Sequence, residues 1–227
     1  MSNNLIKPHG GNLINCYCDQ NESQQYKNNA VNYISHTLTD RQLCDLELIL
    51  NGAFSPLDGF MNQECYNSVL EKNRLLDGNI WPMPIILDVK SDLADKIQIK
   101  DKLALRDKEG YLIAIIQISD KWNYDKSLEA QKVYGTTDIT HTGVRYIFEN
   151  GGDVCLGGKV IGIDRPHHHD FLDIRLDPIE TREYFKINGW DKIVAFQTRN
   201  PMHRAHKEIM QRAAEEIGGP ALLHPVV

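Results

Sequence analysis

The spacing of hydrophobic residues predicts helices in the first part of the chain. Apolar residues recur every three or four positions over 43–50 and again over 63–73, which places them on one face of a helix in each segment. Thr39 and Gln42 have the spacing of a capping box in front of the first helix. Residues 15–32 are rich in Asn, Gln and charge and have little periodicity, so a loop or a poorly ordered segment is expected there.

Short apolar runs predict strands in the middle of the chain. The expected strands are 84–89, 102–106, 111–118 and 154–163. The second and third flank turn residues and are expected to pair as a hairpin, whereas Gly157 and Gly158 are expected to interrupt the last one. A short helix is expected over 127–133. Several short strands with few helices predict an α+β domain that contains a small β-barrel.

A different alternation follows residue 187. A strand over 192–196, a helix over 202–217 and a strand over 221–227 come one after another, and Gly218 marks the end of the helix. This β-α-β order predicts the opening unit of a doubly wound α/β domain.

The composition changes near 164–172, which include three adjacent histidines at 167–169. The domain boundary is expected there, with a β-rich domain over 1–168 and the beginning of an α/β domain over 169–227. A metal site made by the three histidines is disfavoured, because consecutive residues of a helix or strand point in different directions.

Residues suited to oxyanions gather between the last predicted strand and helix. Asn200 and Pro201 have the preferences of an N-cap and a first helical position, so the helix is expected to start there. His203 and His206 are three apart and would share one face of its first turns. The N-terminus of a helix attracts anions, and the planar guanidinium of Arg199 suits a tetrahedral oxyanion. A site for phosphate and a second oxyanion is therefore predicted.

Three interpretations of His203 and His206 compete. They are ordinary surface or core histidines, they bind a metal, or they contact the phosphates of a nucleotide. A metal site is disfavoured because the pair lacks the intervening Glu of a His-Glu-x-x-His motif and has no evident third ligand. Their position directly after 197–201 favours contact with phosphates.

Charge and composition narrow the functional classes. The 227 residues carry a formal net charge of −6, and no stretch approaches the roughly 18 apolar residues of a membrane span, so neither nucleic acid nor a membrane is an expected partner. Five cysteines do not predict a disulfide framework, and Cys44 and Cys65 are expected to be small buried hydrophobes. The N-terminus lacks a secretion signal, so the expected compartment is the cytoplasm.

Several blocks of the sequence resemble one enzyme family in the same order. The block QTRNPMHRAH at 197–206 resembles the signature of ATP sulfurylase, also called sulfate adenylyltransferase. Further blocks that resemble this family are 45–49, 54–61, 81–85, 104–107, 134–138 and 222–227.

The resemblance implies a fold and a reaction. The implied fold is an α+β N-terminal domain with a small PUA-like β-barrel, followed by the start of an α/β Rossmann-like nucleotidyltransferase domain. In the implied reaction, sulfate and ATP, the latter bound to Mg²⁺, form adenosine 5′-phosphosulfate and pyrophosphate. The resemblance also implies small-molecule substrates, a homo-oligomer in the complete enzyme and no tightly bound cofactor.

The same resemblance assigns roles by position. Gln197 and Arg199 would hold sulfate. Catalysis is assigned to Thr198, Arg199, Asn200, His203 and His206. Contacts with the nucleotide are assigned to Gln197, Arg199, Asn200, His203 and His206, and no residue is assigned to a metal. The two histidines would stabilise the charge that develops as pyrophosphate leaves.

Two stretches that the family leads one to expect do not occur: a Gly-Thr/Leu-Thr-Lys-like turn after Val226, and a later Gly-Arg-Asp-His-type loop. The chain is therefore expected to be an incomplete fragment. The alternatives are another nucleotidyltransferase with a His-x-x-His helix, which sulfate dependence would discriminate, and a non-catalytic nucleotide-binding fragment. RNA binding by the β-rich domain is a weaker alternative, because the chain is acidic and lacks an aromatic and basic stripe.

Overall fold

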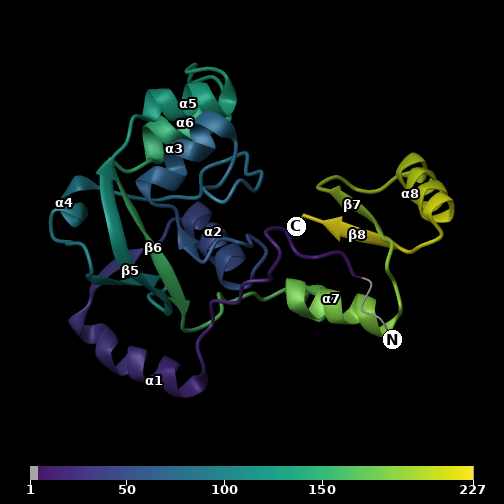
Figure 1. Cartoon of the computed structure of the whole chain (residues 1–227), viewed down its shortest axis with the longest axis horizontal. Coiled ribbons are helices and arrows are strands. Elements are labelled where there is room, and N and C mark those ends of the chain that lie inside the picture. Colours follow the sequence, from purple (N-terminus) through teal and green to yellow (C-terminus); the bar gives the residue numbers. More distant parts are fainter. Residues whose placement is uncertain (1–4, 227) are drawn as a thin grey trace. The chain divides into compact units, whose positions relative to one another are not determined.

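The structure, a computed structural model, describes residues 5–226, and these form two compact units (Figure 1). The larger unit is Pro8–Ile174, and the smaller one comprises residues 5–7 and 175–226. Val227, the last residue of the predicted final strand, lies outside the described residues.

A six-stranded sheet forms the centre of the larger unit. Its strands are β1 (Ile34–Thr37), β2 (Gly59–Phe60), β3 (Leu87–Val89), β4 (Lys102–Arg106), β5 (Leu112–Asn123) and β6 (Val154–Gly162). The hydrogen-bonded order is β1-β4-β5-β6-β2, and β3 also pairs with β6. β4 and β5 form the predicted antiparallel hairpin, in which the Asp107 carboxylate accepts a hydrogen bond from the backbone N–H of Tyr111 at 2.7 Å.

The sheet does not close on itself. β1 lies parallel to β4 at one edge, while β2 and β3 pair antiparallel with β6 at the other. Within residues 5–226 no pairing joins β1 to β2 or β3, so the small barrel that the pattern predicted is not confirmed. β1 and β2 had no counterpart among the predicted strands, because runs of four and two residues are too short to show a period.

β6 continues through Gly157 and Gly158, where an interruption was predicted; that prediction is wrong. A β-carbon on Gly158 would lie 2.1 Å from the backbone oxygen of Gln117 in β5. A β-carbon on Gly157 would lie 2.7 Å from the backbone oxygen of Met61. Both glycines thus allow close approach of neighbouring backbones within a continuous strand.

Helices flank the sheet. They are α1 (Gln20–Asn29), α2 (Asp40–Leu50), α3 (Gln63–Lys72), α4 (Ser91–Ala94), α5 (Lys126–Tyr134) and α6 (Thr142–Asn150). The predictions of α2, α3 and α5 are confirmed, and Thr39 and Gln42 form the predicted capping box at the start of α2. In Figure 1, α3, α5 and α6 gather at one end of the sheet.

The prediction of a loop over 15–32 is wrong, because α1 occupies most of that segment. Asp19 caps the helix by accepting a hydrogen bond from the N–H of Glu22 at 2.9 Å. The hydroxyl of Ser23 donates to the carbonyl of Ile163 at 3.2 Å, and Lys27 pairs with Asp164 at 2.7 Å. These contacts with residues distant in sequence stabilise a helix whose apolar residues show little helical periodicity.

The main hydrophobic core lies against one face of the sheet. Leu46 of α2 packs there with Leu103 and Leu105 of β4, and each is fully buried. Ala104 points to the other face, where it packs with Ile115 in a smaller cluster. Burial of each leucine contributes about 1.5–3 kcal/mol, so the alternation along β4 fixes which face receives α2.

Two cysteines were expected to be buried in helices. Cys44 is exposed on α2, so that prediction is wrong for this residue, whereas Cys65 is half-buried against the main core. Cys44 follows Leu43 by one position, and this step turns its side chain away from the helix face that carries Leu46.

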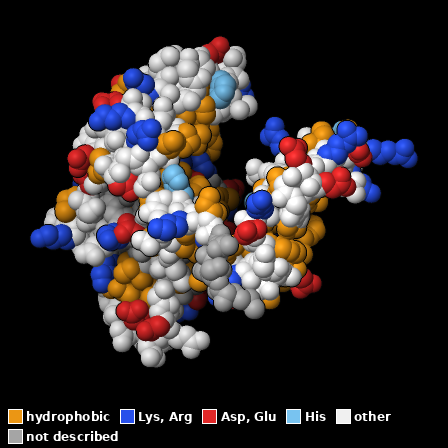
Figure 2. Space-filling view, turned by 45° about the vertical axis from the view of Figure 1, so that its right-hand side comes forward, with side chains coloured by type: hydrophobic (Ala, Val, Ile, Leu, Met, Phe, Trp, Pro, Cys, Tyr) orange, Lys and Arg blue, Asp and Glu red, His pale blue; other side chains and the backbone are white. Residues whose placement is uncertain are grey.

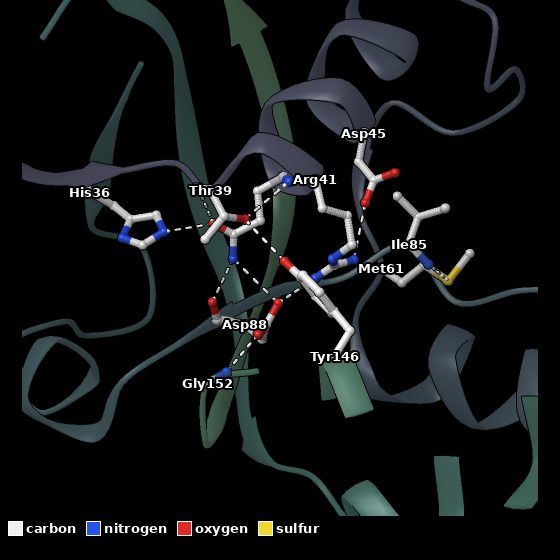
Figure 3. Close-up of polar contacts among 10 residues, drawn as sticks. His36, Thr39, Arg41, Asp45, Met61, Ile85, Asp88, Tyr146 and Gly152 are labelled. Atoms are coloured by element: carbon white, nitrogen blue, oxygen red, sulfur yellow. Dashed lines mark hydrogen bonds and ion pairs between the residues drawn. The ribbon is translucent and has the colours of Figure 1, made fainter. Parts of the chain in front are cut away.

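A polar network joins the start of α2 to β3 inside the larger unit (Figure 3). The carboxylate of Asp88 accepts from Arg41 at 2.6 Å and from the backbone N–H of Gly152 at 2.6 Å. The side-chain N–H of Gln42 donates to the backbone oxygen of Asp88 at 2.7 Å, and the side-chain oxygen of Gln42 accepts from Nε2 of His36 at 3.1 Å. The network satisfies a carboxylate that would otherwise be costly to bury.

The smaller unit contains α7 (Pro178–Ile187), β7 (Val194–Thr198), α8 (Arg204–Ile217) and β8 (Ala221–Pro225). β7 and β8 pair in parallel and α8 connects them, which confirms the predicted β-α-β order. Over 175–226 every described residue keeps part of its surface exposed, and Figure 2 shows hydrophobic side chains on the outside of this unit. Ile187, Ile209 and Leu223 are 75%, 60% and 43% exposed.

An α-helix that crosses a membrane needs about 20 consecutive, predominantly apolar residues. None of the helices over residues 5–226 has the length and the apolar content for it.

Candidate functional site

The segment that joins β7 to α8 forms a tight turn. The hydroxyl of Thr198 accepts a hydrogen bond from the backbone N–H of Asn200 at 3.1 Å and donates to the carbonyl of Asn200 at 3.0 Å. The backbone oxygen of Thr198 accepts from the N–H of Val226 at 2.8 Å. The turn is therefore tied both to itself and to the end of β8.

The start of α8 differs from the prediction. The N-cap is His203 and the first helical residue is Arg204, so the expected start at Asn200 and Pro201 is wrong. The physical reason is the turn. An N-cap residue offers its carbonyl to the first hydrogen bond of the helix, whereas the carbonyl of Asn200 accepts from the hydroxyl of Thr198.

His203 and His206 close the helix start in place of the expected asparagine. The ring of His203 accepts at Nδ1 from the N–H of Ala205 at 3.3 Å. The ring of His206 accepts at Nδ1 from the N–H of His203 at 3.5 Å. The two bonds form a reciprocal capping box, an arrangement usually made by Ser or Thr with Glu or Gln.

The capping box brings the two rings together. Their centroids are 3.9 Å apart, and His206 also contacts the ring of Phe196 in β7 at 5.6 Å. The expected proximity of the pair is thus present, with the first ring at the N-cap and the second at the third helical position.

The charges of α8 run opposite to the order that its dipole favours. Arg204 and Lys207 lie in the first turn, while Glu215 and Glu216 lie in the last. The first turns of α1 to α5 and of α7 each contain an acidic residue instead. Each unfavourable charge at a helix end costs about 0.3–1 kcal/mol. A bound anion at the start of α8 would offset the part of this cost that arises in the first turn.

Gln197 and Arg199 are both exposed, at the end of β7 and in the turn after it. Gln197 is the register partner of His224 in β8, so these two side chains lie on the same face of the strand pair. Phe196, which contacts His206, lies on the opposite face because successive residues of a strand alternate.

His224 belongs to the candidate site, and the spacing of residues did not reveal it. It stands near the carboxyl end of β8, next to the strand that leads into the turn. Ligands of open α/β sheets bind at the carboxyl ends of parallel strands, so the register of β7 and β8 is the signal that would have found it.

The histidines at 167–169 do not converge on one point. The ring of His167 packs against Tyr111 at 4.7 Å, and His168 bonds to the carboxylate of Glu47 at 2.7 Å. Across residues 5–226 no group of three His, Cys, Asp or Glu side chains is arranged to hold a metal ion.

Comparisons with known proteins agree with this arrangement of two parts. Residues 6–165 match the model of the PUA-like domain family, and residues 172–227 match that of the ATP-sulfurylase family. The sulfate adenylyltransferase of Schizosaccharomyces pombe is 46% identical over 90% of this chain and 42% of its own length. That of Candida albicans is 46% identical over 97% of this chain and 44% of its own length.

A solved structure described as a hexameric APS kinase from Thiobacillus denitrificans is similar over 97% of this chain and 39% of its own. The TM-score is 0.79 and the sequence identity 35%. The chain thus spans about two fifths of the length of the relatives it matches. It belongs to the PUA-like domain family, whose model covers residues 6–165, and its residues 172–227 are similar to the ATP-sulfurylase family.

Proposed function

We propose that this chain carries part of the active site of a sulfate adenylyltransferase, which converts ATP and sulfate into adenosine 5′-phosphosulfate and pyrophosphate. The observation that carries the proposal is the reversed charge order of α8, which follows directly on the turn after β7. A helix start that holds arginine, lysine and two histidines is suited to an anion with several charges. The sulfate adenylyltransferase relatives support the choice of substrates.

The reaction needs positioning and charge stabilisation more than covalent catalysis. A sulfate oxygen forms a new bond to the α-phosphorus of ATP, and the bond from that phosphorus to the bridging oxygen breaks. The electron pair of the broken bond leaves with pyrophosphate. Because sulfate and ATP repel each other, cations and N–H donors must face the point where they meet.

The residues of the turn divide between the two substrates. We assign sulfate to Gln197 and Arg199, because the guanidinium donates two parallel hydrogen bonds to an oxyanion. Thr198 and Asn200 shape the turn at the reacting centre through their mutual hydrogen bonds.

The helix start receives the nucleotide phosphates. We assign His203 and His206 to these phosphates, where they stabilise the charge on departing pyrophosphate. Arg199 and Asn200 complete the nucleotide contacts. Mg²⁺ arrives bound to ATP as part of that substrate, and no residue of this chain is assigned to it.

The remaining features belong to the complete protein. We propose that residues 169–227 begin an α/β Rossmann-like nucleotidyltransferase domain and that 1–168 form the PUA-like domain before it. We further propose a cytoplasmic homo-oligomer, with no nucleic acid among its partners. The description of the similar structure from Thiobacillus denitrificans as hexameric supports an oligomer.

One observation favours a second function, a nucleotide-binding fragment without turnover. Within 175–226 no described residue belongs to a buried core. Another nucleotidyltransferase with a His-x-x-His helix would share the anion site and would not depend on sulfate.

The test is ATP formation from adenosine 5′-phosphosulfate and pyrophosphate by this chain, together with binding of both compounds, with Arg199→Ala beside it. We expect binding that weakens strongly in the variant, and turnover, where the chain sustains it, that the variant loses. Removal of an oxyanion donor costs about 3–4 kcal/mol in comparable sites. Equal binding by both chains would overturn the assignment of Arg199, and turnover with pyrophosphate and an adenylyl donor that lacks sulfate would favour the other nucleotidyltransferase.

A further inference from the structure

We infer that His203 and His206 each carry their proton on Nε2 and present that N–H to the bound anion as a neutral hydrogen-bond donor. The inference rests on the proposed function for the identity of the anion, and on the backbone of α8 for the position of the protons. It assigns the two rings a protonation state and a direction, which their spacing in sequence leaves open.

The argument for His203 begins with the N–H of Ala205. A backbone amide is only a donor, so the atom that it contacts must be an acceptor. That atom is Nδ1 of His203, at 3.3 Å. In a neutral imidazole one nitrogen accepts and the other carries the proton, so the proton of this ring lies on Nε2.

The same reasoning applies to His206 with a different donor. Its Nδ1 lies 3.5 Å from the backbone N–H of His203. Both rings thus turn the same nitrogen toward the backbone and the same nitrogen, Nε2, away from it. A proton on Nδ1 of either ring would face an amide proton and break one half of the capping box.

Among the described residues, those that flank the pair in the first turn of α8 and in β7 include two cations and an aromatic ring. The ring centroids are 3.9 Å apart, and α8 contributes Arg204 and Lys207 to its first turn. From β7, the ring that packs against His206 is the uncharged side chain of Phe196. The N-terminus of the helix adds a partial positive charge of its own.

The consequence for the proposed reaction is that the two rings act as hydrogen-bond donors and not as acids. The two Nε2–H groups bind phosphate oxygens as the backbone N–H groups of a helix start do, and they supply no proton to the leaving group. Departing pyrophosphate needs no such proton, because its charge is held by donors and by the Mg²⁺ that it carries.

The direct test is nuclear magnetic resonance of this chain labelled with ¹⁵N in its histidine rings. Couplings between ring protons and nitrogens identify which nitrogen carries hydrogen. We expect both rings to show hydrogen on Nε2 and an unprotonated Nδ1 at pH 7.5. Hydrogen on Nδ1 in either ring, alone or together with Nε2, would overturn the inference whether or not the chain has activity.

A pair of substitutions separates the two nitrogens of His203. Asn places an acceptor where Nδ1 lies, and Asn is a preferred N-cap residue, so His203→Asn keeps the cap and loses the donor. Gln places an amide N–H near Nε2, so His203→Gln keeps the donor and weakens the cap. We expect His203→Asn to retain the slow amide exchange of α8 and to bind pyrophosphate about tenfold more weakly. His203→Gln should retain more of the binding and lose protection in the first turn.

Each remaining outcome has a definite meaning. Unchanged pyrophosphate binding in His203→Asn would overturn the role of Nε2–H as a donor. Protons on Nε2 in a chain that does not bind pyrophosphate at all would contradict the proposed function and leave the protonation state of the two rings established.

Discussion

The guanidinium of Arg41 lies 2.6 Å from a carboxylate oxygen of Asp88, whose side chain is only 5% exposed. A second nitrogen of the same guanidinium lies 3.1 Å from Asp45. One cation therefore serves two carboxylates where α2 meets β3, and its Tyr146 neighbour lies beneath it at 5.4 Å. Ion pairs of this kind cost desolvation when they form, and they cost more when one partner is removed.

We expect Asp88→Asn to lower the free energy of unfolding by about 2–3 kcal/mol. This is less than the 3–5 kcal/mol of a fully buried pair, because a third of the Arg41 side chain is exposed. Urea unfolding followed by tryptophan fluorescence measures the change. The control is Lys108→Ala, whose pair with Asp40 is exposed and contributes about 0–1 kcal/mol. Equal losses in the two variants would contradict the role given to Asp88.

Glu129 gives a prediction for pH. Burial raises the pKa of its carboxyl, Asp88 raises it further, and Tyr66 and Arg41 act in the opposite direction. The folded state therefore holds this proton to a higher pH than the unfolded state does. The free energy of unfolding falls as pH rises from the ordinary value of 4.5 through the raised folded value.

Glu129→Gln should remove this loss. The variant should gain on the original chain as pH rises through that window, by on the order of 1 kcal/mol, and the gain should vanish below pH 4. Urea midpoints between pH 4 and 8 measure the difference. Glu109→Gln is the control, because that carboxyl is exposed. A Glu129→Gln difference that does not depend on pH would contradict the prediction.

Gly158 and Gly143 differ in the group that an added β-carbon would meet. A β-carbon on Gly158 would meet a backbone oxygen of β5, whereas one on Gly143 would meet the outer ring atoms of Tyr134 at 2.6 Å. Backbone within a sheet cannot move aside, but the partly exposed side chain of Tyr134 can. We expect Gly158→Ala to cost about 3 kcal/mol or more and Gly143→Ala about 1 kcal/mol or less, since alanine also favours the helix α6. Thermal unfolding of both variants tests the contrast, and similar melting temperatures would refute it.

The contrast between α2 and α1 shows how far local pattern determines the fold. α2 has a capping box and apolar residues on one face, so its sequence contains the whole signal. α1 depends on Ser23 and Lys27, which bond to Ile163 and Asp164. Partners more than a hundred residues away are absent from any local window of the sequence. The order in which the strands pair, which leaves the sheet open, depends on equally distant residues.

The candidate site was also predicted only in part from its local sequence. The block 197–206 predicted which side chains gather around an anion, and the structure does bring His203 and His206 together. The start of the helix was displaced from Asn200 to His203, because a Thr198 hydroxyl competes for the asparagine backbone. Competition between two local hydrogen-bonding arrangements is decided by geometry that residue preferences do not contain.

The reversed charges of α8 give the last prediction, because they set stability against binding. Arg204→Glu places an acid at the positive end of the helix and should stabilise α8 by about 0.5–1 kcal/mol. The same change puts a negative charge beside the proposed phosphates and should weaken pyrophosphate binding at least tenfold. Glu216→Lys corrects the other end of the helix and should give a similar stabilisation with binding unchanged.

Amide exchange along α8 and calorimetric titration with pyrophosphate measure the two effects separately. If the first turn evolved to bind an anion, only Arg204→Glu should gain stability and lose affinity for pyrophosphate. A loss of binding in Glu216→Lys equal to that in Arg204→Glu would show that the effect is one of helix content or net charge, and it would remove the physical basis for placing the phosphates at this helix start.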